Sequence, residues 1–286
     1  MRDHPSRKRT IRNLVIFCAA IVALGWLAAG IDASMDAASP EEKPGQLLWI
    51  VAPVAVSLLL RAFAGDGWKD LGIRPHLKGN GAWYAVSLLL YPLCVALIVA
   101  LGLLVGAISG SNAAADPVET FVQAWISLLI GEIILNILEE FAFRGYLAPK
   151  MYSLGLNTWV AHALVGLIWG AWHLPYLRAI TPYSSESLWT LVPRFLAGTV
   201  AASLVYGEIR LRTRSVWPAV LMQIAGGTTI GAVMLSGILA IRPAHAFWAT
   251  PVIESLATIL VFGLAGIGLH AWRKRLEPSR PVPNTN

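Results

Sequence analysis

One apolar stretch of the chain contains polar residues that could do chemistry. The run contains Glu132, Asn136, Glu139 and Glu140, and it ends at Arg144. In a helix Glu140 and Arg144 are four residues apart, so they share a face and can form an ion pair. Glu139 points about 100° away from Glu140 and has no obvious cation. A carboxylate that is buried without a counter-charge suits the role of a general base.

A structural interpretation of the same residues stays open. Acidic side chains can hold helices together, or they can lie near a membrane surface, where a charge is less costly. We favour such a bracing role for Glu140 and Arg144. We interpret Glu132 and Asn136 as polar contacts between helices. Glu139 is the residue for which the sequence favours chemistry.

The second candidate is a histidine near the end of another apolar run, Leu-Ile-Trp-Gly-Ala-Trp-His-Leu-Pro. Pro175 predicts a helix end or kink beside His173. We expect a turn near Gly155, 16 residues after Glu139 and 18 before His173. With a rise of about 1.5 Å per residue, an antiparallel hairpin then brings both side chains to nearly the same height, provided that the first helix continues through Tyr146–Leu154. A carboxylate and an imidazole in this arrangement can share one water molecule.

Two neighbours of this histidine have expected places. Trp169, one turn before His173, should pack beside the site and shield it from lipid. His162 lies about three turns away on nearly the same face. We interpret His162 as an interfacial residue.

The composition indicates that these residues lie in membrane helices. Hydrophobic residues make up 56% of the 286 residues and charged residues only 13%, whereas soluble domains carry about 25% charged residues. A helix needs roughly 20 apolar residues to cross the hydrocarbon core. Eight runs are candidates: 13–31, 46–63, 82–109, 120–143, 157–174, 189–206, 216–240 and 251–272. We therefore predict an all-α polytopic membrane helix bundle with about eight transmembrane helices, which has the lipid bilayer as its solvent.

The basic residues predict the orientation of these helices. If both termini are cytoplasmic, the inner segments hold every one of the 22 lysines and arginines except Lys43, Arg178, Arg194 and Arg242. This bias is the one that cytoplasmic loops carry. A cleaved signal peptide is an alternative for the N-terminus, but the first run is long enough to span. We expect a multi-pass protein of the cell membrane.

The chain divides into a basic cytoplasmic N-terminus (1–12), one transmembrane domain (13–272) and a disordered cytoplasmic tail (273–286). Cys18 and Cys94 lie in apolar runs and are expected to be buried as small apolar residues. No Cys/His cluster suggests a structural metal site, and no basic–aromatic patch suggests a nucleic-acid partner. The sequence carries no signature of an oligomeric state.

Several of these stretches resemble the motifs of one family. Residues 139–147, Glu-Glu-Phe-Ala-Phe-Arg-Gly-Tyr-Leu, resemble the EExxxR motif, with its RGYL extension, of the CPBP family. These are the CAAX prenyl protease 2-like and bacteriocin-processing (Abi) membrane proteins. Residues 169–175 resemble the second motif, an aromatic residue four before a histidine, and residues 215–222 are similar to the stretch that leads into the third. With an upstream segment at residues 70–74, the resemblance covers roughly residues 68–240.

The resemblance implies an eight-helix protease with a polar cavity that opens towards the cytoplasm. It implies that Glu139 and His173 activate a water molecule that attacks a peptide carbonyl. The family's third motif, a histidine followed four residues later by asparagine, is thought to stabilise the oxyanion, but this chain has Gln223 and Gly227 there. Glutamine can donate an N–H to an oxyanion but is a poor ligand for zinc, and Gly227 supplies no side chain. Metal dependence has been proposed for the family; here we expect no metal cofactor, and a divalent metal such as zinc is a disfavoured alternative.

These observations favour an endopeptidase that acts on a peptide or membrane-protein substrate. In this hypothesis Glu139 is the general base, His173 shares the water, and Gln223 partly fills the oxyanion hole. One alternative is a catalytically degenerate homologue that binds a peptide or membrane partner in regulation or self-immunity. Proton-coupled transport is a third hypothesis. It is disfavoured because the sequence lacks paired broken helices in two repeated halves.

Overall fold

The computed structural model describes residues 6–35, 43–111, 116–181, 184, 186–242 and 247–276. Within these ranges eight helical stretches are long and apolar enough to cross a membrane, which confirms the predicted all-α membrane bundle. Six of them are single helices: α1 (Arg7–Ser34), α2 (Pro44–Phe63), α3 (Gly81–Leu104), α8 (Leu188–Thr213), α9 (Trp217–Leu235) and α10 (Leu256–Leu276).

The other two stretches are composite. The fourth consists of α4 (Pro117–Ala142), a π-helical turn η2 (Phe143–Leu147) and α5 (Ala148–Ser153). The fifth consists of α6 (Thr158–His173), a 3-10 turn η3 (Leu174–Tyr176) and α7 (Leu177–Ile180).

Two of the expected spans end early. The third and the seventh were expected to run to residues 109 and 240, but the structure has a short antiparallel pair there, β1 (Ile108–Gly110) and β2 (Leu239–Ile241). Gly106 and Gly237 have φ values of 70° and 62°, in the left-handed region that glycine adopts readily and that ends a helix. At the other end of the chain, α10 continues to Leu276, and residues 277–286 of the expected tail lie outside the described residues.

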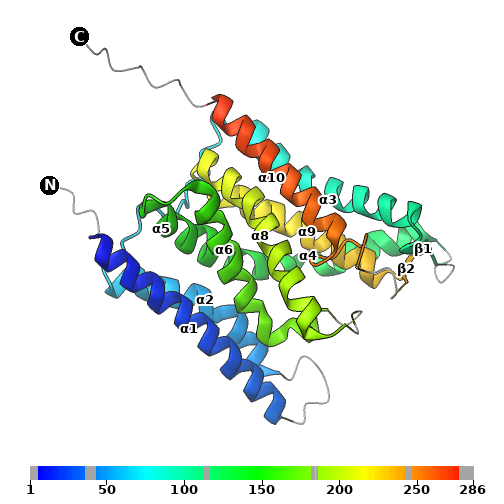
Figure 1. Cartoon of the computed structure of the whole chain (residues 1–286), viewed down its shortest axis with the longest axis horizontal. Coiled ribbons are helices and arrows are strands. Elements are labelled where there is room, and N and C mark those ends of the chain that lie inside the picture. The colour runs from blue at the N-terminus through cyan, green and yellow to red at the C-terminus, as the bar shows by residue number, and fades with distance from the viewer. Residues whose placement is uncertain are drawn as a thin grey trace.

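Three sets of helices make up the bundle. α1 packs on α2, α9 packs between α3 and α4, and α8 packs between α6 and α10. Figure 1 shows the start of α1, the short α5 and the end of α10 at one end of the bundle, with β1 and β2 towards the other end. A large apolar core joins the sets. It includes the indole rings of Trp49 and Trp172, which stack with centroids 4.5 Å apart, while Cys94 is buried and Cys18 is partly buried.

The helix that carries Glu139 continues past Arg144, as the hairpin geometry required. It changes to π-helical hydrogen bonding at Phe143–Leu147, one turn before Pro149. A π turn leaves backbone groups poorly placed for regular bonding. Two arginines from other elements bond to carbonyls of this turn. The Arg61 guanidinium donates to the Gly145 carbonyl at 2.6 Å, and the Arg210 Nε donates to the Arg144 carbonyl at 2.9 Å.

The connection to the next helix also agrees with the prediction. The chain turns between α5 and α6, where Gly155 has a φ of 72°. Asn157 then caps α6, because its side-chain oxygen accepts from the Trp159 backbone N–H at 2.9 Å. α6 ends at His173, directly before the 3-10 turn that contains Pro175.

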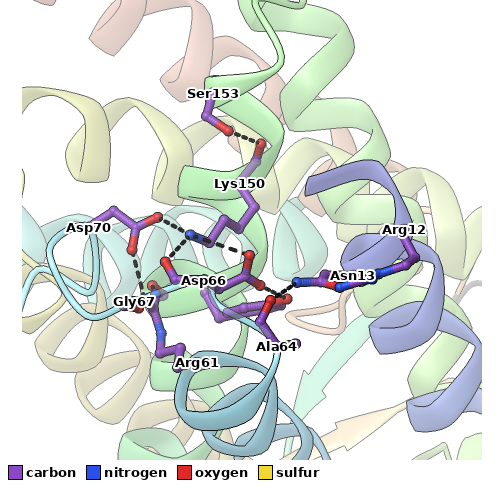
Figure 2. A network of polar contacts seen from close by, with 11 residues as sticks. Arg12, Asn13, Arg61, Ala64, Asp66, Gly67, Asp70, Lys150 and Ser153 are labelled. Carbon is purple, nitrogen blue, oxygen red and sulfur yellow. Dashed lines mark hydrogen bonds and ion pairs between the residues drawn. The ribbon is translucent and has the colours of Figure 1, made fainter. Parts of the chain in front are cut away.

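A polar network ties α5 to the loop between α2 and α3 (Figure 2). Lys150 is buried, and its ammonium lies 2.9 Å from the carboxylate of Asp70 and donates to the Asp66 carbonyl at 2.9 Å. The other Asp70 oxygen lies 2.7 Å from Arg61. The Tyr146 hydroxyl donates to Asp66 at 2.6 Å. The loop therefore holds the end of α5 by charge as well as by packing.

Asp70 makes this connection sensitive to acid. Burial raises the pKa of Asp70, but Arg61 and Lys150 outweigh this effect and hold the pKa below its usual value of 3.8. Because the folded pKa is the lower one, Asp70 contributes stability above its unfolded pKa, and this contribution is lost as the pH falls through the folded pKa. We expect the thermal midpoint in detergent to be lower for Asp70→Asn than for the wild type at about pH 6, and the gap to close below about pH 4.

The control is Glu119→Gln. Glu119 is an exposed carboxylate in the first turn of α4, and it accepts a hydrogen bond from Gln123. Its replacement should leave the pH dependence of the thermal midpoint as in the wild type. A gap between wild type and Asp70→Asn that stays constant from about pH 6 to pH 3 would contradict this account of the loop.

Candidate active site

Three candidate residues from three helices line the same cavity. Glu139 projects from α4, His173 lies at the end of α6, and Gln223 projects from α9. The cavity has a volume of about 370 Å³, and its walls also include Trp49, Tyr91, Asn136, Trp169 and Tyr206. The structure thus brings together side chains that are 34 and 50 residues apart in the sequence.

Trp169 contacts both Glu139 and His173. Its indole N–H donates to the Glu139 Oε1 at 2.5 Å, and its backbone carbonyl accepts from the His173 Nδ1 at 2.9 Å. A carbonyl can only accept, so the His173 Nδ1 carries a proton, and in the neutral form of the imidazole Nε2 keeps a lone pair. Trp169 was expected to shield the site from lipid, and the structure gives it a positioning role as well. It fixes one carboxylate oxygen and the tautomer of the imidazole.

The expected Glu140–Arg144 ion pair is present behind the cavity. The Arg144 guanidinium lies 2.7 Å from the Glu140 carboxylate, and both side chains are at most 1% exposed. The guanidinium also packs against two aromatic rings, 4.4 Å from the Trp169 centroid and 4.3 Å from the Tyr206 centroid. Cation–π contacts of this kind are worth roughly 2 kcal/mol when desolvated. This geometry supports the structural role predicted for Glu140 and Arg144.

Sequence reasoning missed Tyr206. It lies in α8, is fully buried and lines the cavity, and its ring packs against both Arg144 and Trp169. No motif marks it, because a tyrosine in an apolar run is ordinary. The nearest signal in the sequence is Arg144 itself. A buried guanidinium that has a single carboxylate partner favours aromatic rings packed against it.

Glu132 and Asn136 line the cavity as well. The Asn136 side-chain amide donates to the Glu132 carboxylate and to the Glu132 backbone carbonyl, both at 2.7 Å. Across from them Gly227 has no side chain, and a Cβ there would lie 2.2 Å from the Glu132 Oε2. The carboxylate of Glu132 therefore fills the space that a side chain at position 227 would need. These hydrogen bonds stay within α4 and do not form the predicted polar contact between helices, and both side chains face the cavity.

His162, which we interpret from the sequence as an interfacial residue, packs inside the bundle. His162 is fully buried, and its Nε2 lies 3.0 Å from the carboxylate of Glu208 in α8. The same carboxylate pairs with His270 and Arg273 of α10, so it links three helices. The sequence places His162 near a helix start but does not show which helix packs against it. The partner from α8 makes burial of this polar side chain acceptable.

The described residues do not form a metal site. No three histidine, cysteine, aspartate or glutamate side chains come together there as metal ligands. Glu140 is paired with Arg144, and the Glu139 Oε1 accepts from an indole N–H. A catalytic zinc ion usually has three protein ligands, and glutamine at position 223 is a poor one.

Comparison with known proteins matches this region to one family. Residues 121–228 match the family model described as type II CAAX prenyl endopeptidase Rce1-like. The matched segment begins in α4 and ends in α9, so it contains Glu139, His173 and Gln223. No curated protein matches the chain.

Glu132 and Gly227 should be energetically coupled. Gly227→Ala would push the Glu132 carboxylate away from Asn136, and we expect it to lower the free energy of unfolding by about 1–3 kcal/mol. In Glu132→Ala/Gly227→Ala the carboxylate is absent, so the loss should be smaller than the sum of the two single losses. Thermal or denaturant unfolding in detergent measures these differences.

Gly131→Ala is the matched control, because no atom outside its own helix lies within 4 Å of the added Cβ. This variant should be neutral or slightly stabilising. Additive effects of the Glu132 and Gly227 substitutions would show that the two positions do not compete for the same space.

Proposed function

We propose that this chain, which belongs to the CPBP family through its Rce1-like domain at residues 121–228, is an intramembrane endopeptidase. The observation that carries the proposal is the position of Glu139 and His173 in one cavity, where Trp169 holds both. A carboxylate and a neutral imidazole with a free Nε2 are the two acceptors that can polarise one water molecule.

In this mechanism the water hydrogen-bonds to the His173 Nε2 and to the Glu139 Oε2, the oxygen that Trp169 leaves free. Glu139 takes a proton as the water oxygen attacks the peptide carbonyl carbon. The carbonyl becomes an oxyanion, and the Gln223 amide N–H stabilises it. The C–N bond then breaks, and Glu139 returns the proton to the leaving amine. Glu140 and Arg144 position this helix and take no part in the proton transfers.

The mechanism uses no metal. The ligand set does not fit one, so every step is assigned to side chains of this chain. Arg144 is unsuited to replace a metal at the oxyanion, because it is paired with Glu140 and its guanidinium packs against the rings of Trp169 and Tyr206.

We place both termini on the cytoplasmic side of the cell membrane. The distribution of lysine and arginine supports this orientation. The start of α1, α5 and the end of α10 share one end of the bundle (Figure 1), so these basic segments can face one compartment. A peptide or a membrane protein would then reach the cavity from within the bilayer or from the side opposite the termini, where Gln46 at the start of α2 and Ile180 at the end of α7 line its wall.

One competing function is supported by a specific observation. Gly227 supplies no side chain to the cavity wall, and Gln223 stands where the family has a histidine. Removal of one oxyanion donor typically lowers the rate about 100- to 1000-fold. Loss of these two side chains from the cavity wall is what we would expect of a catalytically silent homologue that binds a peptide without cutting it.

Purified wild type and Glu139→Ala, reconstituted in lipid, should separate the two functions. We expect the wild type to generate new termini in a peptide library, detected by mass spectrometry, and Glu139→Ala to cut about 100- to 10,000-fold more slowly because it lacks the general base. Glu119→Ala, which changes a carboxylate outside the cavity on the same helix, should cut like the wild type.

Gln223→His completes the design. If neither wild type nor Glu139→Ala cuts, and Gln223→His alone gains cleavage, the native chain is the silent homologue. Equal cleavage by wild type and Glu139→Ala would remove Glu139 from the mechanism.

A further inference from the structure

The cavity holds more acidic side chains than the proposed hydrolysis needs. Glu132 and Glu139 both line it, and none of the described residues that line it is lysine or arginine. The Arg144 guanidinium, which packs against the lining residues Trp169 and Tyr206, is paired with Glu140. His173 directs its Nδ1–H to the Trp169 carbonyl. One carboxylate, that of Glu139, has a chemical role, whereas Glu132 has none in the hydrolysis.

Two residues set the position of the Glu132 carboxyl group. Gly227 leaves the space for its carboxylate, and Asn136 holds one of its oxygens at 2.7 Å. Both neighbours are neutral, so neither offsets the charge of the carboxylate. A carboxylate in surroundings of low dielectric constant is stabilised far more by a cation than by an amide. The arrangement presents an anchored carboxyl group to a peptide that enters the cavity, and a basic side chain of that peptide would stabilise its charged form.

The spacing along α4 sets the distance from Glu132 to the reacting atoms. Glu132 and Glu139 are seven residues apart, which is about two helical turns on one face and roughly 10 Å along the axis. The π turn begins only at Phe143, so α4 is regular over this stretch. An extended peptide advances about 3.3 Å per residue. A peptide lying along α4 with its cleaved bond at Glu139 thus places a side chain about three residues away beside Glu132.

We propose that Glu132 determines specificity by binding a basic side chain, lysine or arginine, about three residues from the cleaved peptide bond. The inference rests on the proposed endopeptidase function and narrows its substrates to peptides with a basic residue at that distance. The ammonium or guanidinium supplies the counter-charge that Asn136 and Gly227 do not. Such a contact should favour peptides with a basic residue strongly over peptides with a neutral one, because a neutral residue leaves the Glu132 carboxylate without a counter-charge in the cavity.

The test uses N-acetylated, internally quenched peptides, so that the amino terminus carries no charge. Lysine, norleucine or glutamate is placed in turn at each position from two to four residues on either side of the cleaved bond. For the wild type we expect kcat/KM with lysine to exceed that with norleucine at least tenfold at one position about three residues away. In Glu132→Gln this ratio should fall to within about twofold, and Glu132→Lys should favour glutamate over lysine.

Two further variants serve as controls for this test. Glu119→Gln neutralises an exposed carboxylate of the same helix and should keep the wild-type preference. If Glu132→Gln does not fold, Glu132→Ala/Gly227→Ala removes the charge and partly refills its space, and it should lose the preference in the same way.

The outcomes separate this inference from the function on which it rests. Cleavage that depends on Glu139 but shows no preference for lysine at any position would overturn the role of Glu132 and leave the endopeptidase intact. A lysine preference that survives in Glu132→Gln would do the same. The absence of any cleavage that depends on Glu139 would overturn both.

Discussion

The site depends on one buried ion pair. Glu140 and Arg144 are 2.7 Å apart and almost fully enclosed, in a part of the chain where neither charge could be left alone. Breaking a buried pair by removing one partner typically costs about 3–5 kcal/mol, because the remaining charge is uncompensated. The Arg144 guanidinium also packs against Trp169 of α6 and Tyr206 of α8. The pair therefore sets how α6 and α8 meet α4.

This packing determines where Glu139 and His173 lie. Glu139 is the neighbour of Glu140, so it faces a different side of α4 and reaches the cavity while Glu140 faces the protein interior. Trp169 covers Arg144 with its ring, bonds Glu139 through its indole N–H, and orients His173 through its carbonyl. One tryptophan thus relates the structural pair to the two candidate catalytic groups. Replacement of Trp169 by a smaller residue would remove its contacts with Arg144 and Glu139 and change the packing around His173.

Local rules were enough to predict much of this arrangement. The apolar runs predicted the eight helices long enough to span a membrane. The spacing of Glu140 and Arg144 predicted their ion pair, and Pro175 predicted the helix end beside His173. Counting from the turn at Gly155 gave the hairpin that brings Glu139 and His173 to one cavity. Each of these inferences uses contacts within one helix or between two adjacent ones.

What the sequence did not reveal depends on helices that are distant in the chain. The partners Tyr206 for Arg144, Glu208 for His162 and Gly227 for Glu132 come from α8 and α9, and no periodicity within one helix indicates them. The β1–β2 pair was missed for the same reason, since each strand has three residues and forms only by pairing across the bundle.

The π turn at Phe143–Leu147 has a consequence for the register of the chain. A turn with i→i+5 bonding holds about one residue more than an α-helical turn, so everything after it is rotated by roughly 100° from the direction that α4 alone would impose. That offset lets Lys150 point towards Asp66 and Asp70 while Glu139 points into the cavity. A chain shortened by a single residue at this turn would keep its hydropathy and length almost unchanged, yet it could present only one of these two faces correctly.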